Sequence, residues 1–232
     1  MSVNVVFDDK RTHDDWGLEL VRFEIGPPAP VIKKIEIPGR NGALDLTEWA
    51  GQVVYEERQV KIILTGYGSY TRQSLQTGLI AAYLQGAKRK MWLPSDPGYY
   101  YYGRFEIEVS KEDHYVHEYV ISGKVDPFKY ETVSSLEPWE WDSFSFETGI
   151  IREYASLTVD GSMTLLIPGT RMPVVPVIIA EGPDMEVSFN GSCYPLSSGE
   201  NTIYSILLKE GLNTLVFTGN GTVSVAYRGG VL

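Results

Sequence analysis

The chain has 232 residues, 43% hydrophobic and 22% charged, which excludes a disordered or collagen-like polypeptide. Its net charge of −10 makes nucleic acid an unfavourable partner, because a phosphate backbone repels an acidic surface. Fifteen Tyr, eight Phe and five Trp accompany 23 Gly and 13 Pro, a composition that favours strands joined by tight turns. The chain is therefore expected to be mainly β, built as two modest domains or one large β architecture.

Two negative features concern the cellular setting. The single cysteine, Cys193, allows no disulfide within the chain, so the fold does not depend on an oxidising compartment. The N-terminal residues lack the basic and then apolar profile of a signal peptide, and no apolar run approaches the roughly 20 residues that span a bilayer. We therefore expect synthesis and folding in a reducing cytoplasm, without membrane contact.

Charge is distributed unevenly along the chain. Residues 1–130 contain 16 Lys and Arg against 18 Asp and Glu, whereas residues 131–232 contain 4 against 12, giving −2 and −8. The difference indicates two surfaces with different neighbours, although acidic side chains that keep a small β domain soluble would explain it as well. Glu131–Glu147 has no sustained periodicity and includes Pro138, which is typical of a linker. The predicted domains are residues 1–131 and 132–232.

The first domain is predicted to contain four strands and one helix. The strands lie at Val31–Ile37, Gln59–Thr65, Tyr100–Val109 and Tyr115–Val125, of which the first and third would be unpaired edges in a single copy. The helix falls within Ser69–Gly86, where apolar residues recur at helical spacing. We expect its buried face to consist of Leu75, Leu79, Ile80, Tyr83 and Leu84.

The second domain is predicted to be a succession of hairpins. Asp160-Gly161, Asn190-Gly191 and Asn220-Gly221 are dipeptides that accept the positive φ angles of tight two-residue turns, and strand-like residues flank each one. Short strands at such spacing predict an antiparallel β-sandwich or jelly roll.

The sequence contains no recognisable catalytic or metal-binding set. His114 and His117 have a spacing that places them on opposite faces of a strand, so they cannot bind one ion together. Cys193 has no histidine in its half of the chain to activate it. Glu106 and Glu108 could act as the paired carboxylates of a glycosidase, but any solvated strand face has the same spacing. We therefore predict a protein that is not an enzyme and has no cofactor.

Trp139 and Trp141 allow two interpretations. Exposed tryptophans beside acidic residues can stack on sugar rings, whereas large aromatic residues at a domain junction often bury themselves to fix the domains together. A sugar site and an interdomain contact both remain open for these residues.

Several segments, in their order along the chain, resemble distal tail proteins of siphophages and prophages of Gram-positive bacteria. The more specific matches are the PGRNG-x-LD segment beginning at Pro38 and the DPFKY segment that ends at Tyr130. The remaining matches are Phe23–Ile25, Leu75–Leu84, Leu93–Tyr100, Ile167–Arg171, Pro176–Ile178 and Val225–Leu232. The resemblance extends over nearly the whole chain.

The resemblance implies a structural protein of the virion tail tip or baseplate. It implies an N-terminal domain with one helix that assembles as a hexameric ring, and a C-terminal galectin-like β-sandwich. The expected neighbours are the tail-tube protein, the tail-associated fibre or lysin protein, and receptor-binding proteins used in host attachment. The alternative function is that of a carbohydrate-binding module in host cell-wall adhesion.

The segment at Pro38 is the candidate contact between subunits. A closed ring needs two different patches on each copy, and a glycine-containing loop with a fork-shaped guanidinium donor could supply one of them. An ordinary tight connection between strands would use the same residue types. The candidate interface residues are Pro38, Gly39, Arg40, Asn41 and Gly42.

Overall fold

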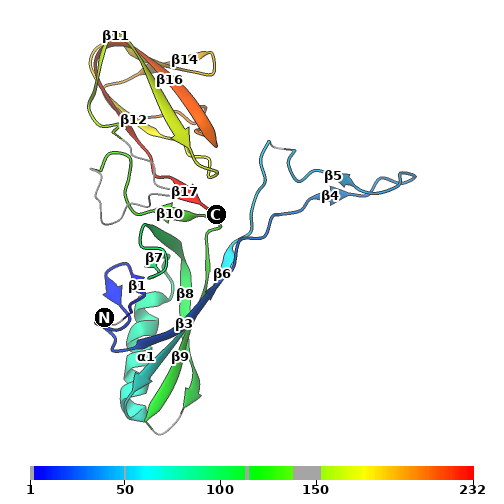
Figure 1. Ribbon diagram of the computed structural model, residues 1–232, viewed down its shortest axis with the longest axis vertical. Coiled ribbons are helices and arrows are strands. Elements are labelled where there is room, and N and C mark those ends of the chain that lie inside the picture. The colour runs from blue at the N-terminus through cyan, green and yellow to red at the C-terminus, as the bar shows by residue number, and fades with distance from the viewer. Residues whose placement is uncertain (1–2, 50, 113–114, 138–152) are drawn as a thin grey trace. The chain divides into compact units, whose positions relative to one another are not determined.

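The computed structural model describes residues 3–49, 51–112, 115–137 and 153–232 (Figure 1). Residue contacts divide the chain into two compact units, Met1–Lys129 and Tyr130–Leu232, and each unit has a hydrophobic core of its own. The described residues are mainly β with a single α-helix, as the composition predicts. In that part of the chain, no helix has the length and apolar character that a membrane crossing requires.

The N-terminal unit is built on one antiparallel sheet. Its strands follow the order β2-β1-β7-β8-β9-β6-β3. They are β1 (Val6–Phe7), β2 (Lys10–Arg11), β3 (Glu19–Ile25), β6 (Arg58–Tyr67), β7 (Arg89–Trp92), β8 (Tyr99–Glu112) and β9 (Val116–Val125). The three strands predicted from Gln59, Tyr100 and Tyr115 onward are therefore confirmed. The expectation that the Tyr100 strand is an edge is wrong for Tyr101–Gly103, which pair with β7; from Arg104 to Val109 the register pairs β8 with β9 and not with β7.

One face of this sheet is buried and the other carries charge. Along β6, Val60, Ile62 and Leu64 are buried while Gln59 and Lys61 are exposed, the period-2 pattern of a half-buried strand. The buried face meets the helix α1 (Tyr70–Leu84), which contacts β8.

Helix α1 begins at an N-cap, Ser69, whose hydroxyl accepts from the backbone N–H of Arg72 at 3.5 Å. At the other end, the Arg89 guanidinium donates to the carbonyl of Tyr83 at 2.7 and 3.1 Å and pairs with Asp8 at 3.1 Å. A cation at this end complements the helix dipole. These contacts attach the helix end to both β1 and β7.

The buried face of α1 agrees with the predicted one in part. Ile80 and Leu84 are buried and Tyr83 packs against the core, as predicted. Leu75 and Leu79 are instead 66% and 73% exposed, and Gln73 is buried. Gln76 on the same side donates to the carbonyl of Trp16, and Thr77 donates to the carbonyl of Gln73 at 2.8 Å. Polar residues can face the sheet because their donors find backbone acceptors.

Between β3 and β6 the chain leaves the sheet as a two-stranded projection, which we call the arm (residues 26–57). Its regular strands are short, β4 (Lys34–Ile35) and β5 (Leu44–Asp45), and they pair antiparallel (Figure 1). The strand predicted over Val31–Ile37 is regular only at Lys34–Ile35.

The C-terminal unit is a curled antiparallel sheet. Its order is β14-β13-β16-β12-β15, with β11 paired along β16, while β10 pairs with β17. The strands are β10 (Lys129–Glu131), β11 (Leu157–Gly169), β12 (Val177–Glu181), β13 (Met185–Phe189), β14 (Ser192–Leu196), β15 (Gly199–Thr202), β16 (Gly211–Ala226) and β17 (Gly230–Val231). The first half of β16 pairs with β13 and the second half with β12, so this strand bends and the sheet closes around its core.

Of the three predicted two-residue turns, one is confirmed. Asn190 and Gly191 have φ angles of 49° and 81° and connect β13 to β14. Asp160-Gly161 and Asn220-Gly221 instead lie inside β11 and β16, where Asp160 is paired with Asn220. Gly161 and Gly221 have positive φ angles there while Asp160 and Asn220 do not, and a Cβ at Gly221 would lie 2.1 Å from the carbonyl oxygen of Glu181. The hairpin prediction was wrong there because a glycine also serves a strand bend or a close backbone contact.

Candidate assembly surface

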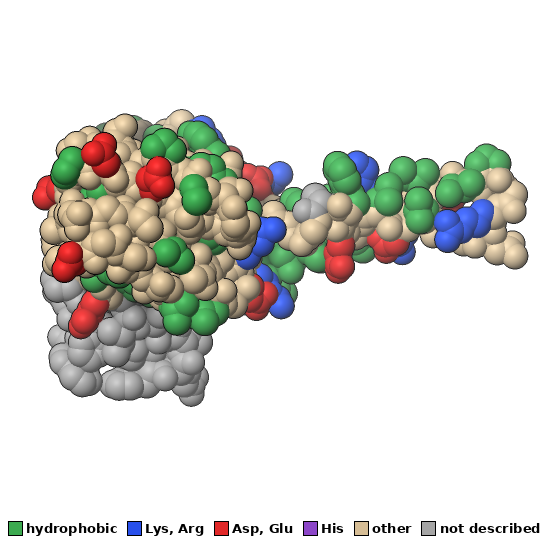
Figure 2. Space-filling model, turned by 90° about the horizontal axis from the view of Figure 1, so that it is seen from above, with side chains coloured by type: hydrophobic (Ala, Val, Ile, Leu, Met, Phe, Trp, Pro, Cys, Tyr) green, Lys and Arg blue, Asp and Glu red, His purple; other side chains and the backbone are tan. Residues whose placement is uncertain are grey.

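The arm exposes apolar side chains that its own chain leaves uncovered. From residue 29 to residue 57, no described residue is buried. The large apolar residues that are exposed there are Val31, Ile32, Ile35, Ile37, Trp49 and Val54. Figure 2 shows apolar side chains along the arm, interspersed with basic and acidic ones. Contiguous apolar surface of this kind marks an interaction site.

Backbone hydrogen bonds hold the arm extended. The N–H of Val31 donates to the carbonyl of Val54 at 2.8 Å, and the N–H of Glu56 donates to the carbonyl of Ala29 at 2.8 Å. Further out, the N–H of Leu46 donates to the carbonyl of Lys33 at 2.7 Å. The arm is therefore a ribbon with its own hydrogen-bond ladder, although it has no core.

Asp45 and Thr47 fix the register of this ribbon. The Asp45 carboxylate accepts from the Thr47 hydroxyl at 2.5 Å and from its backbone N–H at 2.9 Å, and these bonds lower the pKa of Asp45. The Thr47 hydroxyl also accepts from the N–H of Lys33 across the ribbon at 3.2 Å. The Lys33 ammonium lies 5.6 Å from the ring of Trp49. The LD-x-T part of the motif is thus explained by the arm's own geometry.

The predicted interface residues occupy the tip of the arm. Pro38 and Gly39 form the centre of a turn closed by the N–H of Arg40 and the carbonyl of Ile37 at 3.1 Å. Gly39 has a φ of 82°, as the third position of a type II turn requires, and Gly42 has a φ of 79°. All five residues, Asn41 included, are exposed, and Arg40 forms no ion pair with another described residue.

The other motif segments meet within the N-terminal unit. Asp96 pairs with Lys129 at 2.9 Å and accepts from the Tyr101 hydroxyl at 2.9 Å. Burial, together with the charge of Asp96, raises the pKa of Tyr101. Arg58 donates to the carbonyl of Pro127 at 2.7 Å, and burial lowers the pKa of its guanidinium. The SDPGYY and DPFKY segments therefore brace this unit and contribute no reactive group.

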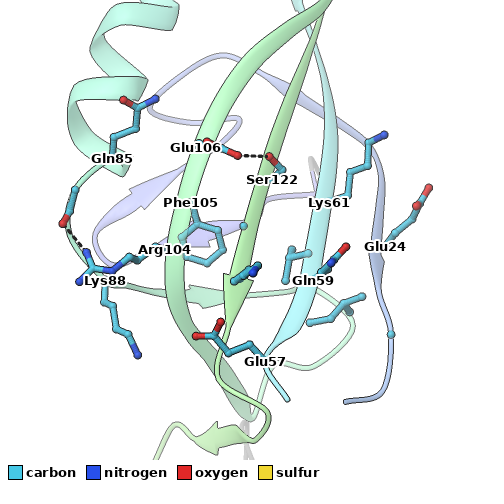
Figure 3. A pocket seen from close by; sticks show the side chains of 16 residues that line it. Glu24, Glu57, Gln59, Lys61, Gln85, Lys88, Arg104, Phe105, Glu106 and Ser122 are labelled. Carbon is cyan, nitrogen blue, oxygen red and sulfur yellow. Dashed lines mark hydrogen bonds between the residues drawn. The ribbon is translucent and has the colours of Figure 1, made fainter. Parts of the chain in front are cut away.

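A groove of about 870 Å³ lies on the charged face of the sheet (Figure 3). Its lining includes Glu24, Lys61, Arg104 and Glu106, and it contains neither histidine nor cysteine. The Glu106 carboxylate accepts from the Ser122 hydroxyl at 3.3 Å, and Arg104 donates to the carbonyl of Gly86 at 2.6 Å. Glu24 lies opposite Lys61 across β3 and β6, and the mixture of charges is typical of a solvated sheet face.

The remaining candidates for chemistry are dispersed. Among the described residues, no group of three potential ligands could hold a metal ion. His117 is buried, with Nε2 2.8 Å from the carbonyl oxygen of Gly68, and His114 lies outside the described residues. Cys193 is exposed, with its sulfur 2.9 Å from the Ser188 hydroxyl. Trp139 and Trp141 also lie outside the described residues, so both interpretations of them stay predictions.

No family model matches the chain, and no curated protein matches it. Among solved structures, the whole chain matches a phage tail hub protein, which defines the class of fold. That structure is the Dit protein (gp 19.1) of phage SPP1, described as a paradigm of the hub adsorption apparatus in phages that infect Gram-positive bacteria. The match has a TM-score of 0.66 and 13% sequence identity, and it covers 100% of both chains. The resemblance seen in the sequence is confirmed at the level of the fold.

Sequence reasoning located the tip of the arm but missed the arm itself. A signal was present, because residues 26–57 form a long connection that begins with three prolines within five residues. Connections of this length inside a compact unit are usually functional. The aliphatic run at Val31 was instead interpreted as part of a sheet.

Proposed function

We propose that the chain is a distal tail protein, the hub of the tail tip of a phage or prophage of Gram-positive bacteria. In this role, six N-terminal units form a ring on the end of the tail tube, with the tail-associated fibre or lysin protein beyond it. The C-terminal units are available to receptor-binding proteins. The protein acts as a structural component in host attachment.

The observation that carries the proposal is the match over the full length of both chains to the SPP1 hub protein. A second support is the uneven distribution of exposed apolar residues. Among the described residues, 14 large hydrophobic residues are exposed in the N-terminal unit and three in the C-terminal unit. A unit that exposes so many needs a partner to cover them. The near-neutral N-terminal half also suits close packing of identical copies better than the acidic half does.

The arm is the proposed subunit contact, with Pro38–Gly42 at its tip. An extended ribbon that has no core gains stability when a neighbouring copy covers its aliphatic side chains. At about 25 cal/mol per Å² of apolar area removed from water, a few such side chains in each of six interfaces would make the ring stable. Arg40 would provide a charged donor for carbonyl or carboxylate oxygens on the neighbour.

Electron microscopy of the purified chain tests the proposal. We expect closed rings of six copies with a central opening, alone or after addition of the tail-tube protein encoded beside it. Light scattering on the same sample should give a mass near six times 26.0 kDa. Particles of a single copy, both alone and with the tail-tube protein, would overturn the proposal.

A further inference from the structure

A second uncovered apolar surface lies on the outward side of α1. We call it the α1 face; its residues are Thr71, Ser74, Leu75, Gly78, Leu79 and Ala82, and all of them are exposed. Leu75 and Leu79 are 66% and 73% exposed, and the only charged residue of the helix is Arg72. The outward face of a surface helix is normally charged and polar. This face instead has the composition of a packing surface.

Gly78 at the centre of the face has no role within its own subunit. A Cβ added there would meet nothing within 4 Å, and the residue does not have a positive φ. Glycine is the least favourable residue in a helix interior apart from proline, so its position calls for another reason. Ser74 and Ala82, one turn on either side, also have small side chains. Together they form a shallow strip beside the two leucines, where another backbone can approach closely.

The arm is the part of the molecule that fits this strip. It is extended, and its aliphatic residues between Val31 and Ile37 are exposed. Its 32 residues carry three basic and five acidic side chains, a net charge of −2, opposite in sign to the single charge of α1. The two surfaces are thus alike in apolar character and opposite in the sign of their charge.

Their places in the N-terminal unit also suit a ring. The arm leaves from β3 and β6, at one end of the strand order, whereas α1 contacts β8, in the middle of that order (Figure 1). A closed ring requires two different patches on each copy, so that each copy both gives and receives one contact.

We propose that the arm of one copy packs on the α1 face of the next copy, with its aliphatic side chains against Leu75 and Leu79. This inference rests on the proposed ring and names the surface that receives the arm. Backbone of the arm lies over Gly78, which explains why the helix tolerates a glycine there. The same contact covers both uncovered apolar surfaces of the N-terminal unit at once.

Cysteine cross-linking in the full-length protein tests this contact. In a Cys193→Ser background, one chain carries Ile35→Cys and a second carries Leu79→Cys, and the two are mixed, assembled and treated with a short bismaleimide. The matched control replaces Leu79→Cys with Lys61→Cys, an exposed position on the charged face of the sheet. We expect at least tenfold more cross-linked pairs with Leu79→Cys than with the control. A chain that carries both Ile35→Cys and Leu79→Cys should give a ladder that ends at six copies.

A variant of the strip provides an independent measurement. Gly78→Leu should fold, because nothing lies within 4 Å of the added Cβ, yet it fills the strip and should weaken assembly at least tenfold. Leu212→Ser, at a position 66% exposed in the C-terminal unit, is the matched control and should assemble normally. Normal rings from Gly78→Leu, or rings without the Ile35–Leu79 cross-link, would overturn the contact and leave the proposed function standing. Absence of rings from the unmodified chain, both alone and with the tail-tube protein, would overturn the proposed function as well.

Discussion

The two units of this chain differ in how completely each covers its own apolar residues. In the C-terminal unit, only Leu166, Tyr204 and Leu212 are exposed among the large hydrophobic residues that the structure describes. In the N-terminal unit, 14 are exposed, of which six lie on the arm and three on α1. The first unit also carries a charge of −2 where the second carries −8. The contrast supports the proposed ring, in which other copies cover the exposed apolar residues of the N-terminal unit.

Of the changes considered, removal of the arm should have the largest effect on assembly. The arm can be shortened by replacing residues 32–53 with an Asn-Gly turn, because Val31 and Val54 are already hydrogen-bonded neighbours. The rest of the unit should stay folded, since no described arm residue beyond Pro28 is buried. We expect loss of assembly by light scattering and an almost unchanged melting temperature by circular dichroism. A variant of this kind that still formed rings would show that other surfaces hold the copies together.

A pair of isoleucine variants separates stability from assembly. Ile62→Ala removes a fully buried side chain of β6 and should lower the free energy of unfolding by about 2–5 kcal/mol. Ile35→Ala on the arm, 46% exposed, should change the stability of the single copy by less than about 0.5 kcal/mol while weakening assembly. Urea unfolding at low protein concentration measures the first effect, and sedimentation measures the second. Equal losses of stability in the two variants would contradict the distinction between a core isoleucine and an assembly isoleucine.

Two glycine variants compare a tightly packed position with an open one. Gly221→Ala places a methyl group 2.1 Å from the carbonyl oxygen of Glu181 and should cost roughly 1–3 kcal/mol of stability in the C-terminal unit. Gly78→Ala on α1 meets nothing and should stabilise the single copy by up to about 1 kcal/mol. Thermal unfolding of both variants gives the comparison. The account of β16 as a strand bent against β12 would fail if Gly221→Ala were neutral.

The smallest expected effect concerns the anchoring of α1 at alkaline pH. The Tyr83 hydroxyl lies 2.6 Å from the Asp9 carboxylate and 2.9 Å from the carbonyl oxygen of Phe7, and burial with the Asp9 bond raises the pKa of Tyr83 to about 12. The folded state therefore favours the neutral phenol, whose contribution is complete below pH of about 10 and is lost as the pH rises through about 12.

Tyr83→Phe should thus be slightly less stable than the unmodified chain near neutral pH. The difference should shrink between pH of about 10 and 12, as measured by urea unfolding across that range. A difference that does not change with pH would mean that the phenol does not titrate as its contacts imply.

Local sequence patterns predicted the regular strands and the helix. They failed for apolar residues that a single copy leaves exposed. The alternation in Gln59–Thr65 identified β6 because one face is buried within the same unit. The helix was found, and Ile80, Tyr83 and Leu84 of its predicted face lie in or against the core. Leu75 and Leu79 were misassigned because they match the periodicity of a core face and are uncovered in a single copy. Val31–Ile37 was predicted as an edge strand, and only Lys34–Ile35 is regular, paired with the short strand β5.

The second source of error is that an Asn-Gly dipeptide in the sequence does not specify its use. Asn190-Gly191 forms a turn with a positive φ at both residues, whereas Asn220-Gly221 lies inside β16 with a positive φ only at the glycine. The pairing of β16 with β11 places it there, and that pairing joins Asp160 to Asn220, far apart in the sequence. The interface residues at Pro38–Gly42 were proposed from a motif, and their exposed position on the arm is compatible with that role without testing it.

Amide hydrogen exchange in assembled and single-copy forms would test the central claim most directly. The single-copy form can be obtained with Ile35→Asp, which places a charge on the arm. The account predicts that assembly slows exchange in the arm and in the first three turns of α1, with β12, β13 and β16 unchanged. Protection of the C-terminal strands, with the arm and α1 exchanging equally in both forms, would contradict it.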